Sequence, residues 1–293
     1  MKTVSISLDD YSPEEVLPVD EEFAEDFARA VERGRDIAKR KRVVFVGMAR
    51  SIAGILPTTI RRLEQIGQQF AKWEAVVVEN DSNDDTKRVL EHWAQQRPGQ
   101  VMADCRDLGY EHLHGFEALR VQRYAELRNR YRTLASQWAP YADYVIAVDL
   151  DAWGGYSTLG VLHSVAMFDD LPHAACMAST SLYRAKTEAG RLVWGHYDLW
   201  ALRHYGPRIR FEPWQPLWLP PPGARPIRVY SAFGALAMYR AKPFYNTPYQ
   251  SYEGDIEHVG LHRNMQSEGW EIYLNPASRV VMHWLEGIEL PQE

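Results

Sequence analysis

Short apolar runs, each followed by a helical repeat, constrain this chain more than any other feature. Continuous apolar runs occupy residues 43–46, 75–78 and 144–148, and a weaker run occupies 101–103. Runs of this length without alternation are typical of strands buried on both faces. The segments between them carry apolar residues at intervals of three or four, which is the spacing of an amphipathic helix. The alternation predicts an α/β fold, with a mostly parallel central sheet and helices on both faces.

The same pattern divides the chain into one main domain and two terminal segments. Residues 1–41 are expected to form an acidic, helical N-terminal extension with a helix from Glu21 to Lys39, and residues 286–293 a C-terminal tail. The main domain, 42–285, has a first half of about 42–151 and a second half of about 152–285. In the second half, residues 206–226 hold seven of the 17 prolines and are expected to form a loop, either as a wall of a site or as a rigid surface excursion. Further strands are expected at 174–178, 230–239, 272–274 and 280–282.

Composition excludes several classes of protein. The net charge is −6 and no dense Lys/Arg stripe occurs, which argues against broad nucleic-acid binding. The only cysteines, Cys105 and Cys176, cannot build a disulfide framework or a four-thiolate metal site. The start has no apolar signal region, and no apolar run reaches the roughly 18 residues that span a bilayer. We therefore expect a cytoplasmic protein without a transmembrane segment. The basic run at 39–42 indicates a solvated helix end or peripheral contact with an anionic membrane.

A pair of carboxylates is the strongest candidate for chemistry. Asp149 and Asp151 follow directly after the buried run at 144–148, and Leu150 separates them. Ligands of parallel α/β sheets bind beyond the carboxyl ends of the strands. Two carboxylates at this place are hard oxygen ligands suited to Mn²⁺ or Mg²⁺, which could bridge the phosphates of a nucleotide. The alternative is a solvated turn.

Polar residues also follow the first two runs. Arg50 comes after the first run, and Glu79, Asn80 and Asp81 come after the second. The side chains of residues 79–81 are expected to bind a ribose hydroxyl or a base edge, although Asp81 or Ser82 could also cap the next helix. Arg128, on the long helix expected at 116–138, suits diphosphate oxygens or the metal-binding acids, unless it is a paired surface arginine.

Acids and histidines cluster again near the end of the chain. Asp255 or Glu257 could act as a general base or stabilise an oxocarbenium-like centre, but acids also favour a helix N-terminus. His258 and His262 have zinc-ligand spacing without the H-E-x-x-H pattern. His283 ends the last apolar run and could complete the coordination of a metal held by the aspartate pair.

Together these residues resemble the GT-A glycosyltransferases over about residues 42–285. More narrowly, RVQRYAELRN (120–129), VENDSNDDT (78–86) and EGDIEHVGLH (253–262) look like the fungal capsule-associated α-1,3-mannosyltransferase group and its bacterial relatives. The resemblance implies a hexosyltransferase whose nucleotide-binding half is 42–151 and whose acceptor half is 152–285. It implies a GDP- or UDP-linked donor, with a tilt to GDP-mannose and retention of configuration, and a glycan or other hydroxyl acceptor.

The resemblance also implies roles for single residues. Asp149 and Asp151 would bind Mn²⁺ (or Mg²⁺) and the donor diphosphate, with His283 as a further metal ligand. Arg128 would steady the diphosphate, and Asp255 or Glu257 would face the acceptor or the anomeric carbon. The remaining donor-binding residues would be Gly47, Ala49, Arg50, Ser51, Glu79, Asn80, Asp81, Leu150 and Gly234.

Three other functions compete with this hypothesis. A sugar-phosphate nucleotidyltransferase would carry a glycine-rich loop with a following lysine, which GMARSIAG (47–54) lacks. A non-catalytic nucleotide- or glycan-binding module of the same fold would bind without turnover. A zinc hydrolase would use His258, His262 and a carboxylate, and would hold zinc tightly.

Overall fold

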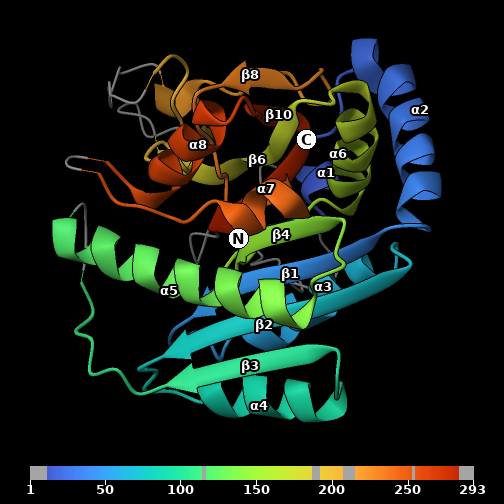
Figure 1. Ribbon diagram of the computed structural model, residues 1–293. Helices are drawn as coiled ribbons and strands as arrows, with labels where there is room; N and C mark the ends of the chain where they lie inside the picture. Colours follow the sequence, from blue (N-terminus) through green and yellow to red (C-terminus); the bar gives the residue numbers. More distant parts are fainter. Residues whose placement is uncertain (1–11, 114–116, 187–191, 207–214, 253–254, 284–293) are drawn as a thin grey trace, which may run out of the picture.

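The computed structural model describes residues 12–113, 117–186, 192–206, 215–252 and 255–283. Its helices are α1 (Pro13–Val16), α2 (Glu21–Ala38), α3 (Leu56–Gly67), α4 (Thr86–Gln96), α5 (Ala118–Trp138), α6 (Thr158–Asp170), α7 (Ala241–Asn246), α8 (Glu257–Ser267) and the 3₁₀ turn η2 (Gln215–Leu217). Its strands are β1 (Arg42–Ala49), β2 (Lys72–Asn80), β3 (Val101–Arg106), β4 (Tyr144–Asp149), β5 (Gly155–Tyr156), β6 (Ala174–Lys186), β7 (Leu192–His196), β8 (Ile227–Val229), β9 (Leu236–Arg240) and β10 (Glu271–His283). Strands and helices alternate through the first half, as the sequence predicts (Figure 1).

The central sheet is mixed, so the prediction of a mostly parallel sheet is confirmed only in part. The strand order is β3-β2-β1-β4-β9-β6-β10-β5, with β7 and β8 pairing outside this path. Strands β3, β2, β1 and β4 are parallel to one another, and so are β6 and β10, but β9 is antiparallel to both β4 and β6. The first half follows the βαβ rule because a helix returns the chain after each strand. The second half breaks it, because β9 reaches the sheet by irregular chain from β8, without a crossover helix between them.

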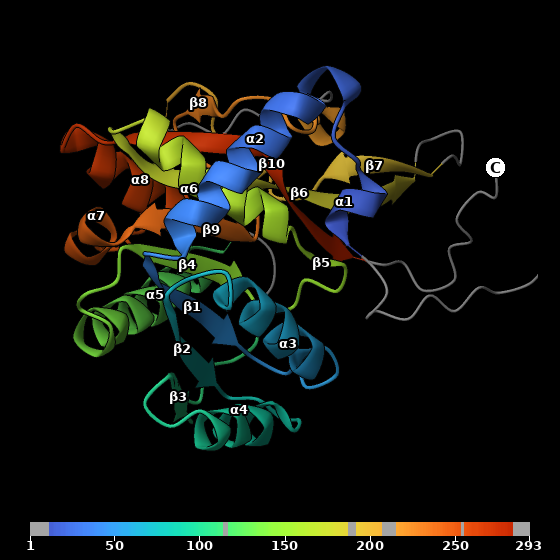
Figure 2. The same cartoon turned by 90° about the vertical axis from the view of Figure 1, so that its right-hand side faces the viewer.

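Two apolar cores lie on the two faces of the sheet, which confirms that helices cover both. Val43 and Phe45 of β1 point into a core shared with α2, α3, α4 and α6. Val44 and Val46 point the other way, into a core shared with α5, α7 and α8. Successive side chains of these strands enter opposite cores, so successive positions are apolar and the strands appear in the sequence as continuous apolar runs. Figure 2 looks onto the face that carries α2, α3 and α6.

Helix α2 packs along α6, and the two backbones come very close. A Cβ added to Gly34 of α2 would lie 1.9 Å from the carbonyl oxygen of Leu162 in α6. The ring of Phe27 stacks on that of His163 at a centroid distance of 5.6 Å. The helix predicted at 21–39 is thus confirmed, and its apolar stripe joins the first core.

The last strand differs from the sequence prediction. The apolar runs at 272–274 and 280–282 belong to a single strand, β10, whose pairing with β6 shifts register between Asn275 and Arg279. A short irregularity therefore separates two apolar stretches of one strand. Among the described residues, no helix is long and apolar enough to cross a membrane.

Candidate active site

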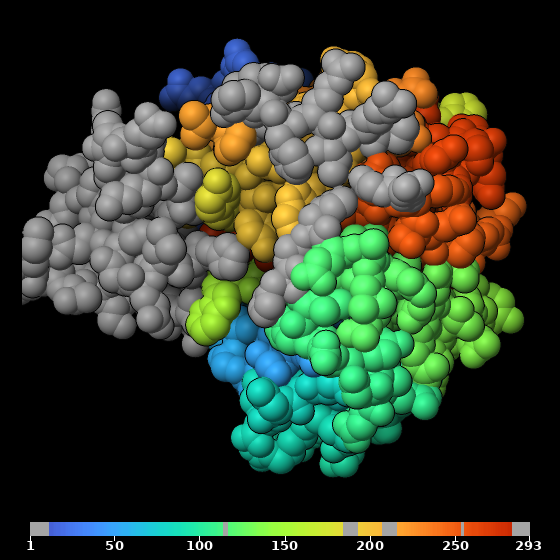
Figure 3. Space-filling model, turned by 90° about the vertical axis from the view of Figure 1, so that its left-hand side faces the viewer, coloured from blue at the N-terminus to red at the C-terminus, as the bar shows by residue number. Residues whose placement is uncertain are grey.

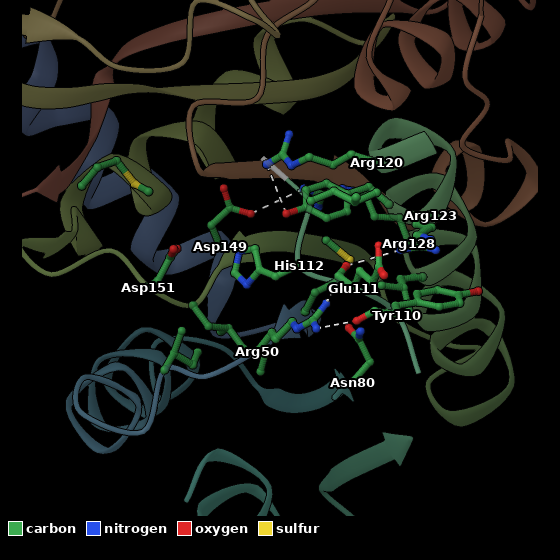
Figure 4. A pocket seen from close by; sticks show the side chains of 18 of the residues that line it. Arg50, Asn80, Tyr110, Glu111, His112, Arg120, Arg123, Arg128, Asp149 and Asp151 are labelled. Carbon is green, nitrogen blue, oxygen red and sulfur yellow. Dashed lines mark hydrogen bonds and ion pairs between the residues drawn. The ribbon is translucent and has the colours of Figure 1, made fainter. Parts of the chain in front are cut away.

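The strands β1, β2 and β4 end at one edge of the sheet, and polar side chains follow them there. Met48 of β1 is level with Asp149 of β4, and β2 ends at Asn80. Beyond this edge lies a cavity of about 340 Å³. Its lining includes Arg50, Asn80, Asp149 and Asp151, which come from these strand ends (Figure 4). The surface along which α5, in green, meets the second half of the chain, in gold to red, is seen in Figure 3.

Four arginines line the same cavity. Arg50 follows β1, and Arg120, Arg123 and Arg128 lie on the inner side of α5. The guanidinium of Arg50 donates to the carbonyl oxygen of Tyr110 at 2.6 Å. Arg123 lies over the ring of Tyr110, and its Cζ is 4.4 Å from the ring centroid. Guanidinium groups suit the flat, multiply charged faces of phosphates, so the cavity favours an anionic ligand.

The carboxylate of Asp149 lies among other acids. Its side chain is 31% exposed, and its Oδ1 is 3.5 Å from a terminal nitrogen of Arg128. Burial is the largest cause that raises the pKa of Asp149, to about 7; Arg128 lowers it, and the charges of Asp151, Asp198 and Glu257 raise it further. A concentration of negative charge of this kind is stabilised by a bound cation.

The aspartate pair fits a cation that is shared with a phosphate ligand. Asp149 and Asp151 supply hard oxygen donors, and the described residues contain no group of three or more His, Cys, Asp or Glu side chains that could hold a metal ion alone. Mg²⁺ in proteins is usually bound by one or two carboxylates together with substrate phosphates, rather than by an all-protein cage. His283 is the last residue of β10, but its side chain lies outside the described part of the chain, so its role as a ligand stays a prediction.

Arg128 is the most deeply buried cation of the site. Its Nε donates to Oε1 of Glu257 at 2.8 Å, and one terminal nitrogen donates to the hydroxyl of Tyr131 at 3.1 Å. Burial by itself lowers the pKa of Arg128, but Tyr131, Glu257 and Asp149 outweigh it and hold that pKa well above its ordinary value. Arg128 therefore stays charged and connects Glu257 of α8 to Asp149 of β4.

Neither of the two predicted catalytic acids lines the cavity. The carboxylate of Glu257 is bound by Arg128, and Asp255 is paired with Arg203 at 2.6 Å. Burial raises the pKa of Asp255, although Arg203 opposes the shift. Each acid is thus held by an arginine, and Glu257 lies directly behind the cavity because its partner Arg128 lines it.

The two histidines of α8 are core residues. The ring nitrogens of His262 are hydrogen-bonded to Ser231 at 2.8 Å and Tyr239 at 3.0 Å. His258 stacks on Phe233 with ring centroids 3.9 Å apart, and burial, followed by Arg128 and His262, lowers its pKa well below the ordinary value. Both nitrogens of His262 are occupied by protein hydroxyls, which leaves none for zinc.

Several predicted donor-binding residues support the cavity rather than line it. Asp81 accepts hydrogen bonds from the backbone N–H groups of residues 108, 109 and 110 at 2.8, 2.8 and 3.1 Å. Glu79 accepts from the N–H of Ser82 at 2.9 Å, and Ser51 contacts the same turn through the Ser82 hydroxyl at 2.9 Å. Ala49 and Leu150 do line the cavity, whereas Gly47 and Gly234 do not. A Cβ on Gly47 would lie 3.1 Å from Leu150 Cγ, so this glycine leaves room for that side chain.

Sequence reasoning missed two parts of the site. One is the segment 110–113 after β3, which lines the cavity and has no periodic pattern to reveal it. The other is Asp198, whose carboxylate raises the pKa of Asp149 and accepts from the N–H of Gly234 at 2.9 Å. Asp198 is separated from the aspartate pair by nearly 50 residues and stands in no recognisable motif, so only the fold brings them together.

Comparison with known proteins adds a likeness of fold. No family model and no curated protein matches the chain. Among solved structures, GalNAc-T7 with UDP, GalNAc and Mn²⁺ matches 92% of this chain and 54% of its own length, at 14% identity and a TM-score of 0.46. The mannosyltransferase PcManGT from Pyrobaculum calidifontis, in complex with GDP-Man and Mn²⁺, matches 91% of this chain and 68% of its own, at 13% identity and a TM-score of 0.48. S. aureus TarS 1-349, in complex with UDP-GlcNAc, matches 84% of this chain and 60% of its own, at 14% identity and a TM-score of 0.47.

These neighbours are glycosyltransferases of the GT-A type. The chain thus spans between 54% and 68% of the length of the matched chains. TM-scores below 0.5 assign no activity to it. The narrower resemblance to the fungal capsule-associated group stays a prediction.

Proposed function

We propose that this protein is a divalent-metal-dependent glycosyltransferase, which moves a sugar from a nucleotide-diphosphate sugar to a glycan or other hydroxyl acceptor. One observation carries the proposal. Asp149 and Asp151 share a single cavity, at the carboxyl edge of the sheet, with the guanidinium groups of Arg50, Arg123 and Arg128. The arginines would attract a diphosphate, whereas the two carboxylates would repel it. A divalent cation bound between the carboxylates and the phosphates removes this repulsion.

Each part of the cavity has a task in this proposal. Asp149 and Asp151 hold the cation, which when bound neutralises charge on the diphosphate as it leaves. Arg128 adds a fixed positive charge beside Asp149, and Glu257 orients that guanidinium through the bond of 2.8 Å. Preorganised charge of this kind is stronger in a partly buried site than in water. A direct role for Glu257 as general base requires its carboxylate to exchange Arg128 for a substrate hydroxyl.

In this proposal the nucleotide binds at the ends of β1 and β2. Asn80 and Arg50 line that part of the cavity, and Arg50 also holds the segment 110–113 through two backbone carbonyls. Glu79, Asp81 and Ser51 support this wall from behind. The donor is a GDP- or UDP-linked sugar, and the resemblance of the sequence to mannosyltransferases makes GDP-mannose the first to be tried.

In this proposal the acceptor binds at the mouth of the cavity, and three exposed aromatic side chains are candidates to contact it. Trp153 is 42% exposed, Tyr197 41% and Trp200 36%, and Tyr197 lines the cavity itself. Aromatic faces of this kind can bind the apolar faces of sugar rings while the hydroxyl groups stay in water. A glycan acceptor fits this surface.

Thermal unfolding with nucleotide sugars tests the proposal. UDP-, GDP- and CDP-sugars are each added with and without Mn²⁺. A ligand at 100 times its Kd stabilises the native state by about 2.7 kcal/mol, which corresponds to a rise in Tm of roughly 5 °C. We expect one nucleotide to give this rise only with Mn²⁺, and Asp151→Ala to abolish it. Asp169→Ala, an exposed aspartate on α6 outside the cavity, is the matched control and should behave as wild type.

Two results would speak against this function. If the folded protein shows no rise with any nucleotide in the presence of Mn²⁺, the proposal fails. If a nucleotide sugar binds with Mn²⁺ but no nucleoside diphosphate is released in the presence of a panel of glycan acceptors, a non-catalytic binding module of the same fold becomes the better hypothesis.

A further inference from the structure

The loop that carries the aspartate pair is held by its backbone carbonyl groups. The hydroxyl of Tyr156 donates to the carbonyl oxygen of Asp149 at 2.6 Å. The hydroxyl of Thr59, on α3, donates to that of Leu150 at 2.9 Å. One guanidinium nitrogen of Arg62, one turn further along α3, reaches the carbonyl oxygens of residues 152 and 153 at 3.3 and 3.0 Å. Four of the five carbonyls from 149 to 153 thus have a side-chain donor.

The opposite side of this loop is fixed by β10. The N–H groups of Trp153 and Gly154 donate to the carbonyl oxygens of residues 282 and 281 at 3.1 and 2.9 Å. Side chains of α3 and Tyr156 donate to the carbonyl groups of the loop, and carbonyl groups of β10 accept from its N–H groups. The backbone before and after Asp151 is thus held in one conformation. The side chain of Asp151 itself is exposed at the cavity.

Burial makes these bonds costly to lose. Thr59 is fully buried and Tyr156 is only 5% exposed, so water cannot readily replace either hydroxyl. Arg62 is fitted closely as well, because a Cβ added to Gly155, at φ +86°, would lie 2.9 Å from Cζ of Arg62. The glycine leaves the space in which the guanidinium lies against the loop.

We propose that Thr59, Arg62 and Tyr156 are positioning residues, which set the affinity of the aspartate pair for its divalent cation by fixing the backbone of residues 149–153. None of the three needs to touch the cation. Outer partners that orient first ligands commonly change metal affinity by about 10–100-fold. The inference rests on the proposed function, because it assumes that Asp149 and Asp151 bind the cation.

The test measures Mn²⁺ binding rather than turnover. Free Mn²⁺ is followed by electron paramagnetic resonance during titration of the protein, with UDP or GDP present at a fixed saturating concentration. We expect Arg62→Ala, Thr59→Val and Tyr156→Phe each to weaken Mn²⁺ binding by about tenfold. Arg62→Lys, which can still donate to a carbonyl, and Thr59→Ser, which keeps the hydroxyl, should recover most of the affinity.

Arg61→Ala is the matched control. Arg61 is the neighbouring arginine on α3, and one of its terminal nitrogens donates to the hydroxyl of Thr58 within the helix at 3.3 Å. A purely structural role of Arg62 or Thr59 would lower the Tm of the metal-free protein and leave Mn²⁺ affinity of the folded protein unchanged. If Arg62→Ala does not fold, the positioning role is tested by comparing the Mn²⁺ affinity of Thr59→Val with that of Thr59→Ser.

The failures of the two proposals can be told apart. Wild-type protein that binds no Mn²⁺ with either nucleotide overturns the proposed function and this inference with it. Wild-type protein that binds Mn²⁺, with variants that stay within about twofold of it, overturns the positioning role alone. An equal loss in Arg61→Ala also overturns it, because the effect would then not come from the bonds to the loop.

Discussion

Removing the acid of the buried Arg128–Glu257 pair is expected to destabilise the protein strongly. Both side chains are 5% exposed, and Arg128 keeps its charge because its pKa is held well above the ordinary value. In Glu257→Ala the guanidinium loses a charged bond of 2.8 Å and stays buried. Breaking a buried pair costs about 3–5 kcal/mol. Asp149, 3.5 Å away, still compensates part of the charge, so we expect the lower end, about 3 kcal/mol.

Urea unfolding of purified variants measures this loss directly. Glu257→Gln keeps an acceptor for Arg128 but not the charge, so it should lose only about 1.5 kcal/mol. Glu25→Ala removes an acid that is 85% exposed and paired with Arg29, and should change the free energy of unfolding by no more than about 0.5 kcal/mol. For a chain of this size, about 3 kcal/mol corresponds to a fall in Tm of roughly 6 °C. A loss below about 1 kcal/mol in Glu257→Ala would refute the view that this pair is buried and coupled.

Three further outcomes are expected elsewhere in the chain. Burial raises the pKa of Asp81, but hydrogen bonds from Asn80 and from the N–H groups of residues 108–110 outweigh burial and lower that pKa below its ordinary value. Because the folded pKa is the lower one, the stability advantage of wild type over Asp81→Asn in urea should be constant above about pH 5 and shrink as the pH falls through the native pKa; an advantage unchanged at pH 3 contradicts this. Gly234→Ala, at φ +63° with its new Cβ 1.7 Å from a carbonyl oxygen, should lose at least about 2 kcal/mol, clearly more than Gly269→Ala, at φ +87° with nothing within 4 Å. Metal analysis of purified protein should find no stoichiometric zinc, because both ring nitrogens of His262 bind core hydroxyls; tightly held zinc that is lost in His262→Ala would revive the hydrolase hypothesis.

Local patterns were sufficient to predict the first half of the fold. The runs at 43–46 and 144–148 are strands β1 and β4, and the repeat through 116–138 is helix α5. Each of these elements is determined by residues within one window, and helical crossovers make successive strands parallel. The direction of β9 depends instead on its pairing with the distant strands β4 and β6, and an apolar run does not show in which direction its strand runs. The antiparallel strands within the mostly parallel sheet could not be predicted for that reason.

The candidate site was predictable only where the sequence places it at a strand end. Asp149 and Asp151 could be located because they follow a strand that the sequence itself identifies. The partner of Glu257 could not, because Arg128 lies 129 residues earlier, on another helix. The side chains that donate to the 149–153 backbone could not be predicted either. The sequence of a helix does not show which distant carbonyl group its threonine or arginine will bind.

The close contact between α2 and α6 also bears on where this chain can be shortened. Phe27, Val31 and Ile37 belong to the same apolar core as β1 and α6, and Gly34 brings the two helix backbones together. A chain that began at Arg42 would uncover an apolar strip of α6 and leave Leu162 facing solvent. Such strips favour self-association. The smallest fragment worth expressing therefore begins before Glu21, and sequence variants at position 34 should be as poorly tolerated as changes at the cavity itself.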